Sequence, residues 1–317
     1  MKNSVSVIIP FYQRSMGLLE KALLSVAQQS AFSQIDKVIV VDDGSPIGAR
    51  EEIEQLNNNQ PLLEKIQLIE KPNGGVASAR NAGIDAVSAE VKYVALLDPD
   101  DVWLPDHLEL ALEALRSGSD FHFNNFTHIG QTVGAFERAG YITPSEHPPL
   151  DNEYNHTYKG DIVRQITTAN VIGASSVIYD IKKHKDCRFK TDFQFAGEDY
   201  LMWLDITRNT DGISFTNKIT THCGEGINLF SGAAWCSAHL SKRLFDEINY
   251  RYFLLQNIAM TESNRLRVVE MLFDNRNAYI GNLQSMLKRL KLSGIVLLLK
   301  HFTYNKPFRD TFLKRIK

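Results

Sequence analysis

Residues 93–103, Tyr-Val-Ala-Leu-Leu-Asp-Pro-Asp-Asp-Val-Trp, join an apolar run to three acids, Asp98, Asp100 and Asp101. Carboxylates clustered at the end of a buried strand repel one another and are costly to desolvate. A divalent cation removes that cost, because Mg²⁺ and Mn²⁺ prefer oxygen ligands and share their remaining sites with substrate phosphates. The cluster therefore predicts a site for a metal ion and a diphosphate. The alternative is a polar turn in which Asp98 or Asp101 caps the next helix.

With the acidic cluster, four polar clusters follow predicted strands. The strands are residues 4–10, 37–41, 65–70 and 92–97. The clusters are Phe11-Tyr12, Asp42-Asp43, Lys71–Gly75 and Asp98–Asp101. Because ligands bind beyond the carboxyl ends of the strands in open α/β sheets, we expect these clusters to meet at one edge. Taken alone, Asp42–Ser45 is equally typical of a simple turn.

Helices alternate with these strands at a period of about 30 residues, which predicts an α/β fold with a mostly parallel sheet flanked by helices. We expect a fifth strand over residues 120–125, a hairpin or mobile loop over 130–160, and a strand over 171–179. The predicted helices are residues 16–29, 47–58, 75–86, 105–116 and 198–208, followed by a C-terminal helical region with helices 238–259, 262–291 and 293–303.

Phosphate-binding glycine loops are absent from the chain. It contains neither G-x-x-x-x-G-K-[ST] nor a G-x-G-x-x-G after the first strand, which argues against P-loop and dinucleotide-binding proteins. A nucleotide-binding sheet without such loops needs a metal ion to neutralise phosphate. The pair Gly74-Gly75 allows close backbone approach and opens a helix whose free N–H groups can bind an acceptor, or it is only a helix entry turn.

Five segments together resemble the family 2 glycosyltransferases. They are SVSVIIPFY (4–12), VDDGS (41–45), GGVASARNAG (74–83), LDPDD (97–101) and GEDYLMW (197–203). These enzymes are inverting and metal-dependent and have the GT-A fold. The resemblance covers roughly residues 4–230, and it implies a glycosyltransferase domain over 1–230 and a helical region over 231–317.

The resemblance implies a role for each matching residue at the nucleotide-sugar. Pro10 and Tyr12 frame the base, and Asp43 bonds it. Gly75 and Arg80 lie close to the nucleotide. Asp98 and Asp100 lie near the ribose and the sugar, and Asp101 is the metal ligand. These donor-site residues are Pro10, Tyr12, Asp43, Gly75, Arg80, Asp98, Asp100 and Asp101.

Asp199 matches the catalytic base. Transfer with inversion needs a base opposite the leaving diphosphate, to take the proton of the attacking hydroxyl. Glu198 would place the acceptor, and Trp203 would carry the helix into the core or line the acceptor pocket. Without the resemblance, Glu198 and Asp199 are also typical of a helix N-terminus, where carboxylates are favoured.

His222 matches loosely a histidine that closes over the diphosphate, in some members on the metal. A structural role is the alternative. Residues 224–232, Gly-Glu-Gly-Ile-Asn-Leu-Phe-Ser-Gly, depart from the usual ending of the family.

The composition is that of an ordinary globular protein, with 317 residues, 44% hydrophobic and 23% charged. The three cysteines have no metal-type spacing and indicate reduced thiols in a cytosolic protein. We expect no signal peptide, no membrane span and no nucleic-acid partner.

Residues 288–317 hold nine Lys/Arg and one acid, Asp310. Leucines and isoleucines alternate with these bases. This pattern predicts basic amphipathic helices on an anionic membrane surface, on the inner face of the plasma membrane. The alternative is packing on the body or on a second subunit, as a homo-oligomer.

The sequence therefore predicts transfer of a sugar from a nucleotide-sugar, with UDP favoured, to a hydroxyl of a glycan or lipid-linked glycan acceptor, with Mn²⁺ or Mg²⁺. The setting that the resemblance implies is bacterial surface-polysaccharide assembly. A nucleotidyltransferase is one alternative, although residues 11–16 lack the basic, glycine-rich loop that it needs. A non-catalytic nucleotide-sugar or glycan-binding protein is the other.

Overall fold

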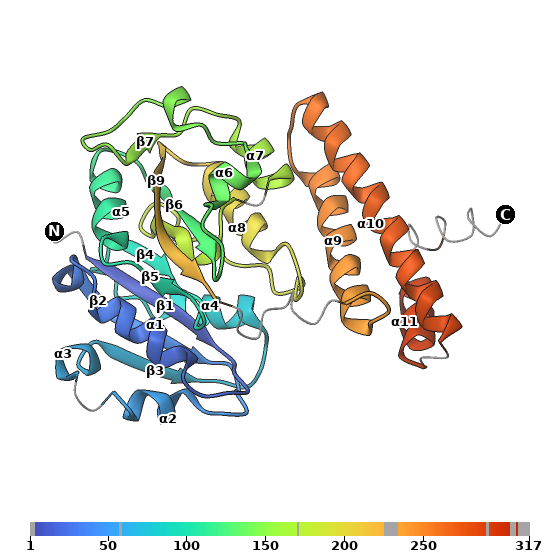
Figure 1. Cartoon of the computed structure of the whole chain (residues 1–317), viewed down its shortest axis with the longest axis horizontal. Coiled ribbons are helices and arrows are strands. Elements are labelled where there is room, and N and C mark those ends of the chain that lie inside the picture. Colours follow the sequence, from blue (N-terminus) through green and yellow to red (C-terminus); the bar gives the residue numbers. More distant parts are fainter. Residues whose placement is uncertain are drawn as a thin grey trace. The chain divides into compact units, whose positions relative to one another are not determined.

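The structure is a computed structural model that describes residues 4–56, 59–169, 171–224, 234–289, 292–304 and 309. It divides the chain into two compact units, Met1–Asp192 with Glu198–Ile227, and Phe193–Gly197 with Asn228–Lys317. The first unit is an α/β domain and the second is helical (Figure 1). None of the helices in the described ranges is both long and apolar enough to span a membrane.

One sheet runs through the first unit in the order β3-β2-β1-β4-β8-β6-β9-β5, with β7 paired to β9. Strands β1 to β4 are parallel, as the alternation of strands and helices predicts. Strand β8 is antiparallel to both β4 and β6, and β9 is parallel to β6. The strands are β1 Val5–Phe11, β2 Ile35–Asp42, β3 Ile66–Glu70, β4 Tyr93–Leu96, β5 Val102–Trp103, β6 Phe121–His128, β7 Asn155–Thr157, β8 Val177–Asp180 and β9 Ile213–Cys223.

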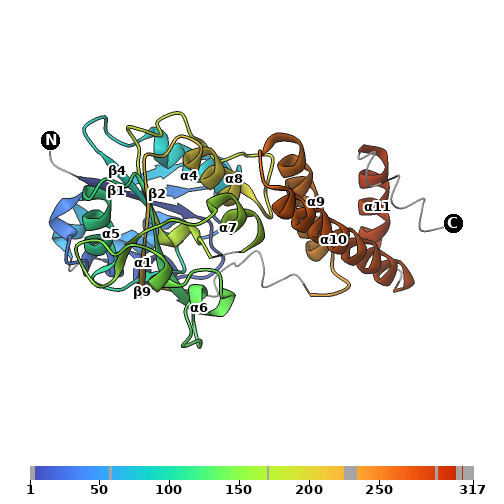
Figure 2. The ribbon, with the colours of Figure 1, turned by 90° about the horizontal axis from the view of Figure 1, so that it is seen from above.

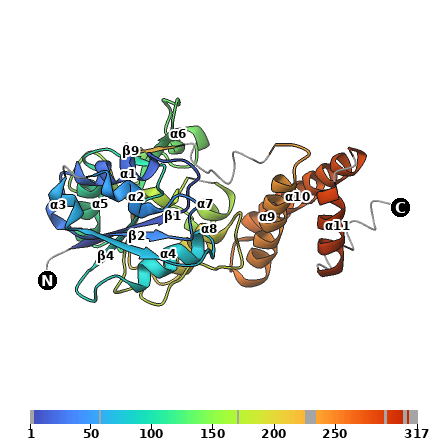
Figure 3. The same ribbon diagram turned by 90° about the horizontal axis from the view of Figure 1, so that it is seen from below.

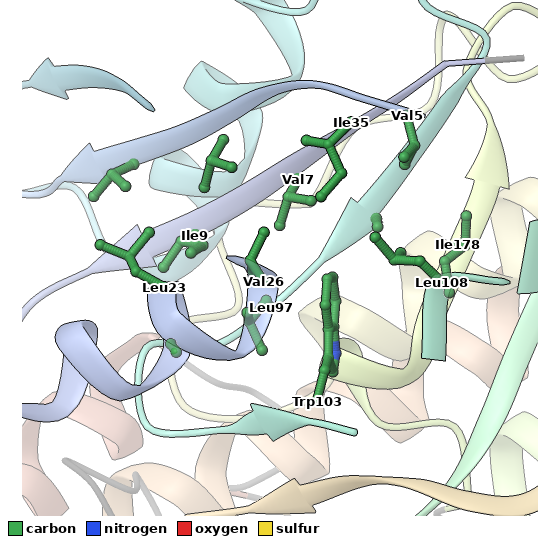
Figure 4. Close-up of a cluster of buried hydrophobic side chains, with 14 of the residues drawn as sticks. Val5, Val7, Ile9, Leu23, Val26, Ile35, Leu97, Trp103, Leu108 and Ile178 are labelled. Carbon is green, nitrogen blue, oxygen red and sulfur yellow. The ribbon is translucent and has the colours of Figure 1, made fainter. Parts of the chain in front are cut away.

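Helices cover both faces of the parallel part of the sheet (Figures 2 and 3). The helices of this unit are α1 Leu18–Ala27, α2 Ala49–Glu54, α3 Gln60–Leu63, α4 Val76–Asp85, α5 His107–Arg116, α6 Ala135–Ala139, α7 Ile162–Thr168 and α8 Glu198–Thr207. Side chains alternate along a strand, so β1 sends Val7 and Ile9 into the core under α1, where Leu23 and Val26 meet them (Figure 4). Ile8 points to the other face, under α4.

Helix α4 lies unusually close to β1. A Cβ atom at Gly83 would lie 2.4 Å from Cγ2 of Ile8, so only glycine permits this approach. Arg80 stands one turn earlier on the same helix, and the close packing fixes its distance from the sheet.

The segment 130–160 contains the predicted hairpin in part, because Pro149 and His156 form an antiparallel bridge, and it also contains regular elements that were not predicted. It contains α6, and β7 joins the main sheet by pairing with β9. Strand β7 has polar residues, and their burial is compensated by side-chain hydrogen bonds. Asn155 donates to the carbonyl of Leu110 at 2.8 Å and accepts from the hydroxyl of Thr216 at 2.6 Å. The strand predicted over 171–179 begins only at Val177, after a 3₁₀ turn over Ala174–Ser176.

The second unit consists of α9 Ala238–Asn257, α10 Glu262–Lys288 and α11 Leu292–Tyr304. Their bounds are close to those predicted from the apolar spacing. Ser237 and Thr261 cap α9 and α10 by accepting from the backbone N–H three residues on, of Leu240 and Asn264. Leu244, Leu272 and Leu283 belong to the core of this unit.

Candidate active site

The carboxyl ends of β1, β2 and β3 meet at one edge of the sheet. The N–H of Asp43 donates to the carbonyl of Phe11, and the N–H of Lys71 donates to the carbonyl of Asp42, each at 2.9 Å. Pro10 is buried in β1 opposite Val41, and Tyr12 is half-buried just beyond it. The predicted clusters at this edge are therefore neighbours in space.

Asp43 holds the loop that follows β3. Its carboxylate accepts from the N–H groups of Gly74, at 3.0 Å, and of Gly75, at 2.7 Å, and it pairs with Lys71. Gly75 has a φ of 87°. The two glycine N–H groups therefore bind Asp43, and the prediction that the first N–H groups of the following helix, which begins at Val76, bind an acceptor stays a prediction. Only 2% of Asp43 is exposed.

The acidic cluster after β4 is anchored at both ends. The N–H of Asp98 donates to the hydroxyl of Ser175 at 2.9 Å, and the carboxylate of Asp101 accepts from the N–H of Gly224 at 2.8 Å. Asp101 is also hydrogen-bonded to the side chain of Cys223. Residues far apart in the sequence thus anchor the first and the last acid of the cluster.

Negative charge accumulates in this cluster. Burial, and then the charge of Asp98, raise the pKa of Asp100 to about 6. Burial, Asp98 and Asp100 together raise the pKa of Asp101 to about 8. Arg80, which pairs with Asp98, is the cation that meets the cluster in the described structure. This donor set fits a divalent cation, because hard cations bind carboxylate oxygens and relieve such repulsion.

The described residues contain no group of three or more His, Cys, Asp or Glu side chains arranged to hold a metal ion. A cation held here would therefore take further ligands from water or from the substrate, as Mg²⁺ commonly does. His222 lies on β9 opposite Val102, and its neighbour Cys223 is the residue that contacts Asp101. Since neighbouring side chains in a strand point to opposite sides, this geometry gives His222 no support as a ligand, and its metal role stays a prediction.

Helix α8 brings two more acids to the site. Gly197, with a φ of 96°, turns the chain into the helix, and Glu198 and Asp199 occupy its first turn. Burial and the neighbouring Asp199 raise the pKa of Glu198 to about 7, although Arg80 opposes the shift. Burial also raises the pKa of Asp199, again against the effect of Arg80. Both acids are therefore stronger bases than free carboxylates.

Arg80 joins the acidic cluster to α8. Its guanidinium lies 2.8 Å from Asp98 and 3.4 Å from Glu198, and the ring of Phe189 covers it with its centroid at 5.2 Å. Burial would lower the pKa of Arg80, but the two acids raise it. Arg80 thus links α4, the end of β4 and the start of α8. The sequence resemblance implies that Arg80 lies near the nucleotide, but no pattern in the sequence marks these partners.

Trp203 is not positioned to contact an acceptor. It is completely buried, its indole N–H donates to the carbonyl of Ile172 at 3.3 Å, and its ring packs against Phe121 and Phe189. Of the two predicted roles, the structure supports the one in the core. Ser175, Phe189 and Cys223 also belong to the site, but no local pattern in the sequence marks them.

The chain matches a known enzyme family. Residues 6–182 match the family described as glycosyl transferase family 2. The succinoglycan biosynthesis protein ExoW of Rhizobium meliloti is 30% identical over 250 residues, which are 76% of this chain and 75% of ExoW. The protein named putative teichuronic acid biosynthesis glycosyltransferase TuaG of Bacillus subtilis is 32% identical over 254 residues, which are 80% of this chain and 91% of TuaG.

Solved structures show the same fold. S. aureus TarS 1–349 in complex with UDP-GlcNAc superposes with a TM-score of 0.60 and 19% identity, covering 96% of this chain and 88% of that one. The mannosyltransferase PcManGT from Pyrobaculum calidifontis, in complex with GDP-Man and Mn²⁺, superposes with a TM-score of 0.58 and 15% identity, covering 98% and 83%. The protein therefore has the fold of the GT-A glycosyltransferases. It belongs to glycosyltransferase family 2, which confirms the resemblance found in the sequence and decides against a nucleotidyltransferase.

Proposed function

We propose that this glycosyltransferase moves a sugar from a UDP-sugar to an acceptor hydroxyl, with inversion, during assembly of a surface polysaccharide or lipid-linked glycan. The observation that carries the proposal is the pair of ion pairs made by Arg80. They connect Asp98 of the acidic cluster to Glu198, which stands beside the proposed base, Asp199. Two relatives carry names of polysaccharide biosynthesis, and TarS was solved with UDP-GlcNAc, which supports the donor class. Because PcManGT was solved with GDP-Man, the choice of UDP rests on the resemblance around Asp43.

The donor would lie at the edge where β1, β2 and β4 end. Tyr12 and Pro10 would frame the base, with Asp43 presenting the Lys71–Gly75 loop to it. Asp98 and Asp100 would accept from hydroxyls of the ribose and the sugar, since carboxylates are acceptors. Arg80 would fix Asp98 in place for that contact.

Asp101, with Asp100 beside it, would hold a Mn²⁺ or Mg²⁺ ion. A bound ion would neutralise the charge that grows on the departing diphosphate. Mn²⁺ in the PcManGT complex supports a divalent ion. The high pKa of Asp101 fits a residue that is stable as a carboxylate only beside a cation.

Asp199 would remove the proton from the attacking hydroxyl. Its raised pKa makes it a stronger base than a free aspartate, and the charge of Arg80 acts against that rise. Glu198, paired with Arg80, would orient the acceptor hydroxyl or hold the base in position.

The test is a screen of nucleotide-sugars for release of nucleoside diphosphate, with and without Mn²⁺. We expect Asp101→Ala to lose metal-dependent donor binding. We expect Asp199→Asn to keep donor binding but to lose turnover by at least ~10²-fold, the lower scale for losing a general base.

Asp205→Asn is the matched control, because Asp205 lies on the same helix but pairs with Lys190 at 3.1 Å. Full activity of Asp199→Asn would assign the base to another residue. Donor binding without turnover in the unmodified protein would favour a non-catalytic binding protein.

We further propose that the C-terminal region contacts an anionic membrane surface. In the described part of α11, Val296 and Leu299 are more than 60% exposed, and Lys300 is exposed beside them. An apolar stripe flanked by bases is typical of helices that lie on anionic lipid. Deleting residues 288–317 should abolish co-sedimentation with anionic vesicles, and unchanged binding would refute this proposal.

A further inference from the structure

The chain enters helix α8 through a short entry segment, residues 193–197, which lies outside any helix or strand. This segment groups with the helical unit, whereas the next residue, Glu198, begins α8 in the α/β unit. One peptide bond joins the two, and consecutive Cα atoms across a trans peptide bond are about 3.8 Å apart. The position of the entry segment therefore constrains the position of the first turn of α8, which carries Glu198 and Asp199.

One face of α9 is occupied by the entry segment. The residues of α9 that meet it recur at helical spacing and are Lys242, Asp246, Tyr250 and Phe253. Residues at this spacing lie on one side of a helix. Leu244 and Ile248, on the opposite side, belong to the core of the helical unit. Helix α9 thus has two packed faces, one in the core and one against the entry segment.

Asp246 holds the backbone in the middle of the entry segment. One oxygen of its carboxylate accepts from the N–H of Gln194 at 3.1 Å and from the N–H of Phe195 at 2.9 Å. Burial raises the pKa of Asp246, while these two N–H groups and the charge of Lys300 oppose the rise. Asp246 therefore supplies an acceptor to two N–H groups that belong to no helix or strand, and backbone N–H groups need such partners when they are buried.

The two ends of the entry segment also meet α9. The ring of Phe193 packs edge to face against the ring of Phe253, with centroids 6.2 Å apart. At the other end, a Cβ atom at Gly197 would lie 2.9 Å from Cγ of Tyr250. Only glycine permits this approach, and the φ of 96° at Gly197 also favours glycine. Helix α9 therefore holds the segment at its beginning, its middle and its end.

We propose that α9 positions the catalytic base by holding the entry segment, and that Asp246 is the positioning residue. The inference rests on the proposed function, because it takes Asp199 as the base. Asp199 follows Gly197 by two residues, so a displacement of the segment displaces the base. A general base works only within hydrogen-bond reach of the hydroxyl, and a misplacement of about 1 Å costs up to about 10²-fold in rate. The helical unit thus has a part in catalysis without touching the substrate.

Hydrogen exchange of the full chain, resolved to single amides, measures the anchoring without any transferase activity. In the unmodified protein, the N–H groups of Gln194 and Phe195 should exchange at least about tenfold more slowly than in an unfolded chain, because a hydrogen bond to a charged acceptor is worth a factor of about ten or more. Asp246→Ala should remove this protection and leave the amides of α10 protected. Exchange of both amides at the unfolded rate in the unmodified protein would overturn the proposal without any variant.

Turnover is measured with the donor that the nucleotide-sugar screen selects, and nucleotide affinity with UDP and Mn²⁺. We expect Asp246→Ala to lower turnover by roughly ten- to 100-fold, the scale of a misplaced base, and to leave the affinity for UDP unchanged. Asp246→Asn keeps an acceptor oxygen and should restore most of the turnover and of the amide protection. Asp274→Ala, at an exposed acid on α10 of the same unit, is the matched control and should change neither.

The outcomes separate this inference from the proposed function. If Asp199→Asn loses turnover and Asp246→Ala does not, the base is confirmed and the positioning role is refuted. If Asp199→Asn stays fully active, the assignment of the base is wrong and the inference fails with it. A loss of UDP affinity as large as the loss of turnover in Asp246→Ala would also overturn the inference, because a misplaced base leaves the donor site intact.

Discussion

At the scale of single residues, the site depends most on Arg80, because it is the buried cation between two acids that come from different elements. Asp98 lies 18 residues away along the chain and Glu198 lies 118 residues away. Removing one partner of a buried ion pair leaves the other charge uncompensated, which is more damaging than the pair is stabilising.

We expect Arg80→Gln to move the acid limb of the pH–rate profile to higher pH. Arg80 acts to lower the pKa of both Glu198 and Asp199, so removing its charge raises the pKa of the base. On the acid side of the limb, turnover should fall by about 10-fold for each pH unit by which the limb moves. Arg80→Lys should shift the limb less, because it keeps the charge but cannot span both acids.

Arg50→Gln is the matched control, since its pair with Glu70 is exposed on both sides. A fall in turnover with an unmoved acid limb would mean that Arg80 acts only through the packing of α4.

The residues of the site show what local sequence can and cannot predict. Asp98, Asp101, Glu198 and Asp199 are visible in the sequence because each acid stands at the end or start of a periodic element. The hydrogen bonds from Gly74 and Gly75 to Asp43 could not be predicted from residue types alone, because a glycine N–H can donate equally well to a ligand or to a carboxylate of the protein. Trp203 illustrates the same limit, because a large aromatic residue on a helix suits a core and a pocket equally well.

At the scale of elements, apolar periodicity predicts the parallel strands and the three C-terminal helices well, because each buries a regular apolar pattern. It fails for β7 and for residues 213–219 of β9, whose buried residues include polar side chains. Thr216 and Ser214 are fully buried and bond Asn155 and His122. A polar residue is buried at low cost only when a partner is present, and those partners come from distant segments that a local pattern does not include.

We expect Gly83→Ala to destabilise the α/β unit by about 1–3 kcal/mol, the usual cost of overpacking a core. Alanine favours a helix by up to about 1 kcal/mol over glycine, so a simple propensity argument predicts the opposite sign. The clash of the new Cβ with Cγ2 of Ile8 should outweigh this gain in helix propensity, because both atoms belong to rigid elements. Urea denaturation of the full chain measures the change.

The control is a double-mutant cycle with Ile8→Ala, which removes the clashing atom. Gly83→Ala should cost less in that background. If the two changes are additive within about 0.5 kcal/mol, the close approach of α4 to β1 is not what requires glycine at this position.

At the scale of the whole molecule, the stability of the α/β unit depends on histidines that are buried and neutral. His122 is completely buried and contacts Ser214 at 2.8 Å, Asn124 at 2.7 Å and Thr216 at 3.1 Å. Burial lowers the pKa of His122 to about 4, although Asn124 opposes the shift. Burial also lowers the pKa of His107, which is bonded to Thr220 and to Asn124.

The sign of the pH dependence follows from these shifts. Between about pH 6.5 and pH 4, the unfolded chain takes up a proton at His122 and the folded chain does not. Stability is therefore fully present above about pH 6.5 and falls as the pH decreases toward 4, by up to about 1.4 kcal/mol per pH unit for one group. His184 does not oppose the fall, because its raised pKa gives stability that is already complete below pH 6.5 and is lost only as the pH rises through about 9.

We therefore expect His122→Gln to lose less stability than the unmodified protein when the pH changes from 7 to 5, as measured by the urea midpoint of the α/β unit. The raised pKa values of Asp100, Asp101 and Glu198 act in the opposite direction but equally in both proteins, so the difference between the two reports His122. Glutamine keeps a donor and an acceptor for Asn124 and Ser214 but takes up no proton. The same change at His239, in the helical unit, should leave the pH dependence of the α/β unit as it is. An equal pH dependence in His122→Gln would assign the acid sensitivity to other groups, with His107, whose pKa burial lowers, next to be tested. The buried network would then stabilise this part of the sheet without setting its response to pH.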